Sequence, residues 1–218
     1  MKTERWLATG VLFVVFALAA AAGAADQPVA DLPLTTKEAG VSEVSFGDLA
    51  TDALCHATGA PIAFVAAVSF KTGTIEAGPF SEADVARLLQ IPSESWAVSS
   101  LRGAQIRAAL ERSLSRLPLP SGAFLQVSGI TVVFDPSGPR DNRVKQLLVG
   151  GAPIDEAATY EVAMPLSLAK GGAGYFQIFD ANNIVRQGSE GLSRILYQFA
   201  LSRGHVSYTG QGRLVPSR

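Results

Sequence analysis

Residues 61–68 read Pro-Ile-Ala-Phe-Val-Ala-Ala-Val, an uninterrupted apolar run. Such a run is typical of a strand that is covered on both faces, because neither side of the strand then meets water. Helical patterns flank it. Residues 46–57 carry apolar side chains at helical spacing after a candidate N-cap, Ser45, and residues 81–89 begin with Ser81 as a cap and acids in the first turn. A buried strand between two amphipathic helices predicts an α/β domain.

Farther along the chain, helix and strand patterns alternate at first and then give way to strands. Residues 96–101 are strand-like, and residues 102–116 form an amphipathic helical pattern that two prolines end. Further strands are expected at residues 124–127, 130–134, 143–149 and 159–163, and a last helix within residues 188–203. These patterns predict one α/β domain with a mixed sheet over residues 43–218, preceded by a lead-in segment at residues 26–42.

Residues 1–25 have the pattern of a secretory signal peptide. A short segment with a net positive charge precedes an apolar run at residues 11–22, and small residues suit cleavage after Ala24 or Ala25. The alternative, an uncleaved anchor, needs an apolar stretch of about 20 residues, which is longer than this run. We therefore expect a periplasmic or secreted protein with no stable membrane insertion after cleavage.

The net charge and the cysteine content bear on two questions, whether the chain binds nucleic acid and whether a disulfide stabilises it. The formal net charge is −1, so the chain has no electrostatic reason to bind nucleic acid. Cys55 is the only cysteine, which excludes a disulfide within the chain. An exported domain of this kind depends on its hydrophobic core for stability.

Short motifs in a fixed order along residues 43–175 indicate a family. They are Glu43-Val-Ser-Phe-Gly-Asp-Leu-Ala-Thr-Asp-Ala, Ala77-Gly-Pro-Phe-Ser-Glu-Ala-Asp-Val, Leu101-Arg-Gly-Ala-Gln-Ile, Phe124-Leu-Gln-Val-Ser-Gly, Pro153-Ile-Asp and Gly171-Gly-Ala-Gly-Tyr. In this order and spacing they resemble the C-terminal domain of the periplasmic and secreted 5′-nucleotidase family. The resemblance implies an α-β-β-α layered domain.

The family's catalytic half has no counterpart among these motifs. In the resembling family, an N-terminal metallophosphatase domain holds two metal ions through several His, Asp and Asn ligands and performs the hydrolysis. This chain has two histidines, His56 and His205, and neither follows an Asp-x or Gly-Asn sequence. A nucleophile elbow and a phosphate-binding Walker loop are absent from the sequence as well. We therefore expect no catalytic residue, no metal ion and no cofactor.

Most of the contacts that the family's C-terminal domain makes to substrate are also replaced. The resemblance aligns residues 65–71 with a loop that supplies Asn and Arg, and only Lys71 is basic there. A lysine is a point charge and does not substitute for the two-pronged contact of an arginine with phosphate. Ala173 stands where the family has Asp, and Ser167 where it has an aromatic residue.

A few candidate ligand residues remain. The resemblance implies that Phe124 stacks on a base, with Gln126 as an amide partner. Gly171, Gly172 and Tyr175 would form the facing turn, and Lys71 would add a weak contact to an anion. Two alternatives stay open: Phe124 as a residue of the strand core, and the glycines as backbone requirements.

Three functions are compatible with these observations. The first is an exported, stand-alone domain that is non-catalytic by itself and acts as a weak nucleoside- or nucleotide-binding or accessory module. The second is a nucleotide phosphohydrolase that works with a separately encoded metallophosphatase chain. The third is an interaction domain of the cell envelope without a small ligand. The absent metal ligands argue against an enzyme that acts alone, and the lost contact residues support the first and the third function equally.

Overall fold

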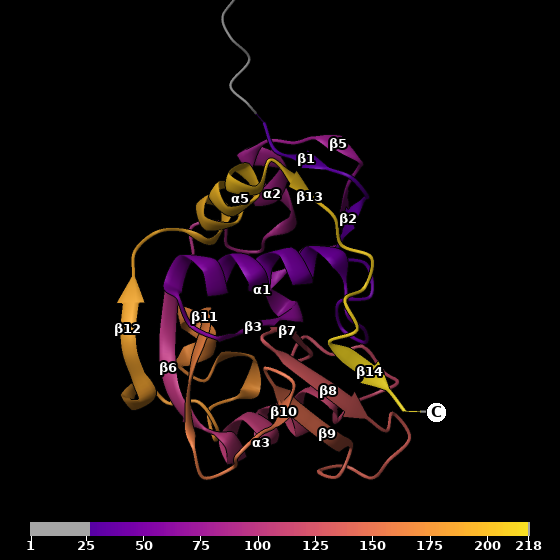
Figure 1. Cartoon of the computed structure of the whole chain (residues 1–218), viewed down its shortest axis with the longest axis vertical. Helices are drawn as coiled ribbons and strands as arrows, with labels where there is room; N and C mark the ends of the chain where they lie inside the picture. Colours follow the sequence, from indigo (N-terminus) through magenta and orange to yellow (C-terminus); the bar gives the residue numbers. More distant parts are fainter. Residues whose placement is uncertain (1–26, 218) are drawn as a thin grey trace, which may run out of the picture.

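The computed structural model of the chain describes residues 27–217 (Figure 1). The expected signal peptide at residues 1–25 lies outside this range. No helix within residues 27–217 has both the length and the apolar composition needed to cross a membrane.

A five-stranded mixed sheet lies at the centre of the fold, with the strand order β12-β6-β11-β3-β7. β3 and β11 are parallel, and every other neighbouring pair is antiparallel. The strands are β3 (Ile62–Ala66), β6 (Trp96–Arg102), β7 (Leu125–Ser128), β11 (Thr159–Pro165) and β12 (Ile184–Gly188). All five residues of β3 are buried, and their side chains alternate between two separate hydrophobic clusters. This confirms the predicted mixed sheet with a strand covered on both faces.

Three helices share the hydrophobic cluster on one face of the central sheet. They are α1 (Ser45–Thr58), α2 (Glu82–Leu88) and α5 (Leu192–Arg203), and α1 lies directly against β3, β7 and β11. Ser81 caps α2 as predicted, because its hydroxyl accepts the backbone N–H of Asp84 while the Asp84 carboxylate accepts the N–H of Ser81. The predicted cap of α1 was wrong. Val44 occupies the N-cap position, and the Ser45 hydroxyl instead accepts the backbone N–H of Thr35 at 2.8 Å.

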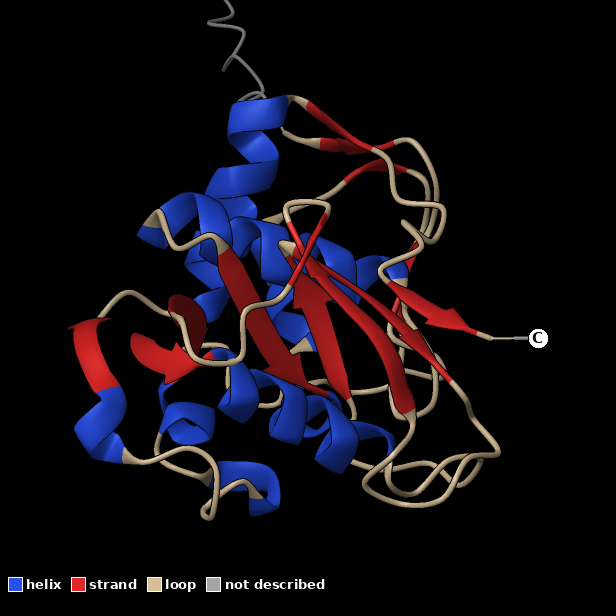
Figure 2. Cartoon of the chain, turned by 60° about the horizontal axis from the view of Figure 1, so that its bottom comes forward, coloured by secondary structure: helices blue, strands red, loops and turns tan. Residues whose placement is uncertain are grey.

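The other face of the central sheet packs on α3 (Gly103–Leu114) and on a four-stranded sheet. The order of that sheet is β10 (Ala152–Pro153), β9 (Val144–Val149), β8 (Ile130–Phe134) and β14 (Leu214–Pro216). The buried carboxylate of Glu111 joins α3 to β9 by accepting the backbone N–H groups of Arg143 and Val144 at 2.8 and 2.9 Å. Helices therefore lie on both sides of the strands (Figure 2), and the predicted α/β class is confirmed.

The lead-in segment is part of the folded unit from Val29 onward. It supplies β1 (Val29–Ala30) and β2 (Leu34–Thr35), and its residues Ala30 and Leu34 are buried. β1 lies between β13 (His205–Val206) and β5 (Gly78–Pro79), and β2 pairs with β4 (Thr74–Ile75). The short helices η1 (Ala67–Ser69), α4 (Leu166–Ala169), η2 (Gly172–Gly174) and η3 (Ala181–Asn183) complete the order of elements.

Candidate functional site

One edge of the central sheet gathers the segments that the sequence analysis selected. The parallel strands β3 and β11 end at Ala66 and Pro165 on this edge. The antiparallel strands begin there, since Trp96 pairs with Pro165 and Leu125 pairs with Ala66. The loops after β3, before β6, before β7 and after β11 therefore all leave from the same edge. Ligands of open α/β sheets bind outside the carboxyl ends of parallel strands, which makes this edge the candidate site.

Phe124 and Tyr175 both lie at this edge, with their rings in the core. Each side chain is 0% exposed. The Tyr175 hydroxyl donates to the backbone oxygen of Ala123 at 2.6 Å, and its ring stacks on Phe179 with a centroid distance of 5.0 Å. Burial raises the pKa of Tyr175 above its ordinary value. Both aromatic rings are thus withdrawn from solvent.

Gln126 is a buried connector between β7 and the loop that precedes α1. Its Oε1 accepts the backbone N–H of Val44 at 2.9 Å, and its Nε2 donates to the backbone oxygens of Ala39 and Ser42 at 3.0 and 2.8 Å. A Cβ on Gly47 would lie 2.5 Å from Oε1, so α1 approaches this amide closely only because residue 47 is glycine. All the hydrogen-bonding positions named here are used within the protein.

The glycines of the turn after β11 meet backbone requirements. Gly171 has φ of 88°, and a Cβ there would lie 2.6 Å from the Cα of Phe176. Its own N–H donates to the backbone oxygen of Leu168 at 2.9 Å. A Cβ on Gly172 would lie 2.7 Å from the backbone oxygen of Ser167. Substitution of either glycine therefore requires the turn to move.

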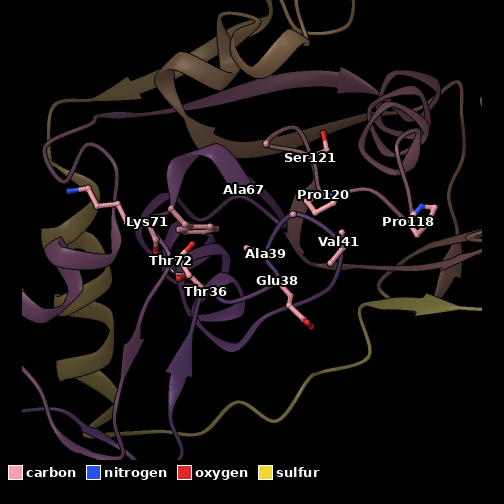
Figure 3. A pocket seen from close by; sticks show the side chains of 13 residues that line it. Thr36, Glu38, Ala39, Val41, Ala67, Lys71, Thr72, Pro118, Pro120 and Ser121 are labelled. Carbon is pink, nitrogen blue, oxygen red and sulfur yellow. Dashed lines mark hydrogen bonds between the residues drawn. The ribbon is translucent and has the colours of Figure 1, made fainter.

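A cavity of about 560 Å³ lies beside this edge (Figure 3). It is enclosed by residues 36–41 of the lead-in segment, residues 67–72 after β3 and residues 118–122 before β7. Its charged residues are Lys71 and Glu38, whose side chains extend away from each other in Figure 3. The Thr36 hydroxyl fixes the Lys71 segment by donating to the Lys71 backbone oxygen at 2.7 Å.

The expected ligand residues do not line a single cavity in the structure. Lys71 lines the 560 Å³ cavity, and Gly171, Gly172 and Tyr175 are not among its lining residues. Phe124 lines a neighbouring apolar cavity of about 340 Å³, which shares Val41 and Pro118 with the first. Sequence analysis missed the wall formed by residues 36–41, because it treated them as a lead-in.

The structure also locates the remaining polar side chains that were considered for chemistry. His205 pairs with Asp31 at 2.8 Å on the surface, and His56 lies against Phe199 with a centroid distance of 5.3 Å. Within residues 27–217, no three or more His, Cys, Asp and Glu side chains form a group that could hold a metal ion.

These features define an α/β domain whose candidate site lies at the carboxyl edge of a mixed sheet. A family model described as "5'-nucleotidase, C-terminal domain" matches residues 21–181. The chain belongs to this family.

Curated relatives and solved structures agree with this assignment. The snake venom 5'-nucleotidase of Naja atra is 32% identical over 123 residues, which are 53% of this chain and 23% of that protein. A 5'-nucleotidase-related protein of Glossina morsitans morsitans is 33% identical over 169 residues, 66% of this chain and 30% of the relative. The 5'-nucleotidase precursor of Thermus thermophilus superposes with a TM-score of 0.78 at 28% identity, covering 87% of this chain and 39% of that one. The chain thus spans less than half of each of these relatives.

Proposed function

We propose that this chain is an accessory module in nucleotide hydrolysis, exported and non-catalytic by itself. In this proposal it presents the carboxyl edge of its central sheet to a separately encoded metallophosphatase chain. The observation that carries the proposal is the exposure of large apolar side chains on loops at this edge. Val68 and Ile91 are each 54% exposed, and Phe176 is 71% exposed.

Backbone hydrogen bonds hold the segments of Val68 and Ile91 at the edge. The N–H of Val68 donates to the oxygen of Gly122 at 2.9 Å. The N–H of Gln90, next to Ile91, donates to the oxygen of Ser69 at 2.8 Å. Phe176 directly follows Tyr175. Exposed apolar residues can mark sites of protein association, and the placement of these three on segments that leave from the same edge supports a partner there.

The aromatic and amide groups at the edge support the non-catalytic part of the proposal. Phe124, Gln126 and Tyr175, which the resemblance would direct at a base, are occupied by internal contacts. The relatives carry more than half of their length outside the matched region, and a metallophosphatase chain would supply the missing chemistry.

The cavity beside the edge favours a second function, the weak binding of a small ligand. We propose that it accepts a nucleoside at least as readily as a nucleotide. The cavity volume is about 560 Å³, within the usual range for small-molecule sites. Lys71 and Glu38 together give the cavity lining no net charge, so the cavity offers no net attraction to a phosphate. Association with nucleic acid is not part of this proposal.

The partner proposal is tested with purified mature chain and the metallophosphatase portion of the Thermus thermophilus relative, prepared without its own C-terminal part. We expect the chain alone not to hydrolyse AMP with added Mn²⁺ or Zn²⁺, and we expect a complex in sedimentation velocity. A Val68→Ser, Phe176→Ser double variant should weaken the complex. Val185→Ser is the matched control, since Val185 is 52% exposed on β12. Metal-dependent turnover by the chain alone that survives His56→Ala would refute the proposal.

Export is tested separately. The signal-peptide pattern predicts a mature N-terminus after Ala24 or Ala25, in the periplasm or the medium. Mass spectrometry of the intact protein measures this end. A chain that retains Met1 in the membrane fraction would contradict the prediction.

A further inference from the structure

The C-terminal segment crosses from one small sheet to another. We define the strap as residues 207–216, between β13 and the end of β14. β13 pairs with β1, and β14 pairs in parallel with β8. Figure 1 shows the strap descending past α1 between these two strands. Leu214 and Pro216 of the strap form part of the wall of the apolar 340 Å³ cavity.

A single carboxylate holds the backbone of the strap. Glu43, two residues before α1, accepts the N–H of Gln211 through Oε1 at 2.5 Å. Its Oε2 accepts the N–H groups of Arg213 and Leu214 at 2.8 and 2.9 Å. Three backbone donors on one carboxylate form strong, charge-assisted hydrogen bonds while Glu43 is ionised.

The side chain of Arg213 enters between α1 and β7. Its Nη2 lies 2.9 Å from Oδ2 of Asp52, and its Nη1 donates to the backbone oxygen of Val127 at 3.0 Å and to the Thr51 hydroxyl at 3.2 Å. The Tyr208 hydroxyl donates to the same Asp52 oxygen at 3.0 Å. The strap is therefore held by a charged network as well as by β-pairing.

Beneath this network lies the buried carboxyl group of Asp48. Asp48 is 0% exposed, and among residues 27–217 neither of its oxygens accepts a hydrogen bond, whereas a protonated Asp48 can donate one to Glu43. Nη1 of Arg213 lies 3.6 Å from Oδ1, which is an ion-pair distance but too long for a hydrogen bond. A buried ionised carboxylate is costly unless it is paired and hydrogen-bonded. The geometry thus favours a neutral Asp48 while the strap is closed.

The surrounding charges agree with this assignment. The titratable groups that face Asp48 are Glu43 from the preceding loop, Asp52 from α1, and Arg213 and Tyr208 from the strap. Burial raises the pKa of Asp48 from 3.8 to about 8, Arg213 opposes the shift, and the charges of Glu43 and Asp52 add to it.

We propose that the strap is a pH-responsive clasp, which closes over α1 while Asp48 is neutral and opens when Asp48 loses its proton. Ionisation places a third carboxylate beside Glu43 and Asp52 in a site that excludes water. Opening lets water solvate Asp48 and relieves this repulsion. It also removes β14 from β8 and takes Leu214 and Pro216 off the apolar cavity.

The direction of the pH effect follows from proton counting. In the open form, Asp48 is hydrated and its pKa returns toward 3.8, whereas in the closed form it is about 8. Between these values the closed form binds one more proton than the open form. Raising the pH in this range therefore favours opening, by about tenfold in the equilibrium constant per pH unit. Above the upper value the effect levels off.

Hydrogen exchange on the mature protein between pH 6 and pH 9 tests the clasp. Exchange rates are divided by those of an unstructured peptide with the sequence of residues 207–217, which removes the intrinsic effect of pH. We expect the protection of the Gln211, Arg213 and Leu214 amides to fall about tenfold per unit up to pH 8. Amides shared by β6 and β11 should show no such trend.

Two variants separate the clasp from general pH effects. Asp48→Asn should abolish the pH trend in the strap. Asp31→Asn, which removes an exposed carboxylate in contact with His205 before the strap, should retain it. An unchanged trend in Asp48→Asn overturns the proposal. A pH-independent strap in the wild type, or a trend shared by β6 and β11, overturns it without any variant.

Discussion

The side-chain oxygen of Gln126 accepts the backbone N–H of Val44 at 2.9 Å, across 82 residues of sequence. Through this bond and two more to Ala39 and Ser42, β7 holds the loop that forms one wall of the Lys71 cavity. The family resemblance implies that Gln126 contacts a ligand. In this structure its side chain instead holds the loop that lines the cavity.

Replacement of this amide should destabilise the whole domain. Gln126→Leu leaves the Val44 N–H and two backbone oxygens without their partner, so we expect a loss of roughly 2–4 kcal/mol in the free energy of unfolding. Urea denaturation measures it. Gln146→Leu on the exposed side of β9 is the control and should change stability little. A loss below about 1 kcal/mol in Gln126→Leu would contradict the assigned role.

The buried hydroxyl of Tyr175 gives a second prediction. Tyr175→Phe keeps the stacking on Phe179 but removes the 2.6 Å bond to the oxygen of Ala123. We expect the free energy of unfolding, measured by thermal denaturation, to fall by about 1–2 kcal/mol. Because burial raises the pKa of Tyr175 and of Tyr208, ultraviolet titration of the folded wild type should also lack these two tyrosinates in the range where exposed tyrosines ionise. Equal titrations for wild type and Tyr175→Phe up to alkaline unfolding are the expected result.

Global stability should also depend on Asp48. Its pKa is about 8 in the folded chain against an ordinary value of 3.8, so its contribution is fully present below the lower value and is lost as pH rises through the upper one. Asp48→Asn should therefore be more stable than wild type at pH 9, by more than about 1 kcal/mol, with the difference shrinking toward pH 5. Denaturant unfolding at both pH values gives the comparison. An Asp48→Asn variant that is less stable than wild type at pH 9 would contradict the prediction that ionised Asp48 destabilises the fold.

The Lys71 cavity predicts a specific pattern of weak binding. Adenosine and AMP should bind the wild type with similar, weak affinity, because Lys71 and Glu38 offset each other at the cavity. Phe124→Leu should leave both affinities unchanged, since the Phe124 ring is buried and lines the neighbouring apolar cavity. Isothermal titration calorimetry provides the measurement. Micromolar AMP binding with a large phosphate contribution would rule out this account, and a loss of adenosine binding in Phe124→Leu would restore Phe124 as a stacking residue.

The features that sequence predicted correctly depend on nearby residues. An unbroken apolar run predicts that β3 is covered on both faces. The spacing of Ser81 and Asp84, three positions apart, predicts the cap of α2. The cap of α1 was predicted at Ser45 by the same reasoning and was wrong, because Thr35 in β2 uses the Ser45 hydroxyl. Composition near a helix end does not reveal a competing tertiary partner.

The candidate site was less accessible to sequence reasoning. The resemblance implied a ligand site between the Phe124–Gln126 segment and the Gly171–Tyr175 turn, and the strand register places both segments at the same sheet edge. Alignment to a family fixes a residue's position along the chain but does not determine whether its side chain faces a ligand or the core. The wall at residues 36–41 depends on hydrogen bonds from Gln126, and no local pattern encodes such contacts.

The pairing of β1 with β13 joins the two ends of the folded domain. Val29 lies opposite His205, and Ala30 opposite Val206, while β14 closes the edge of β8. During translation, β1 leaves the ribosome long before β13 and β14 have been synthesised. The first strand therefore has no partner at β13 until the domain has been synthesised as far as His205 and Val206, so this pairing forms late in the synthesis of the domain. A truncation that stops after α5 would leave two sheet edges open at once, and the expected fate of such a fragment is aggregation or proteolysis.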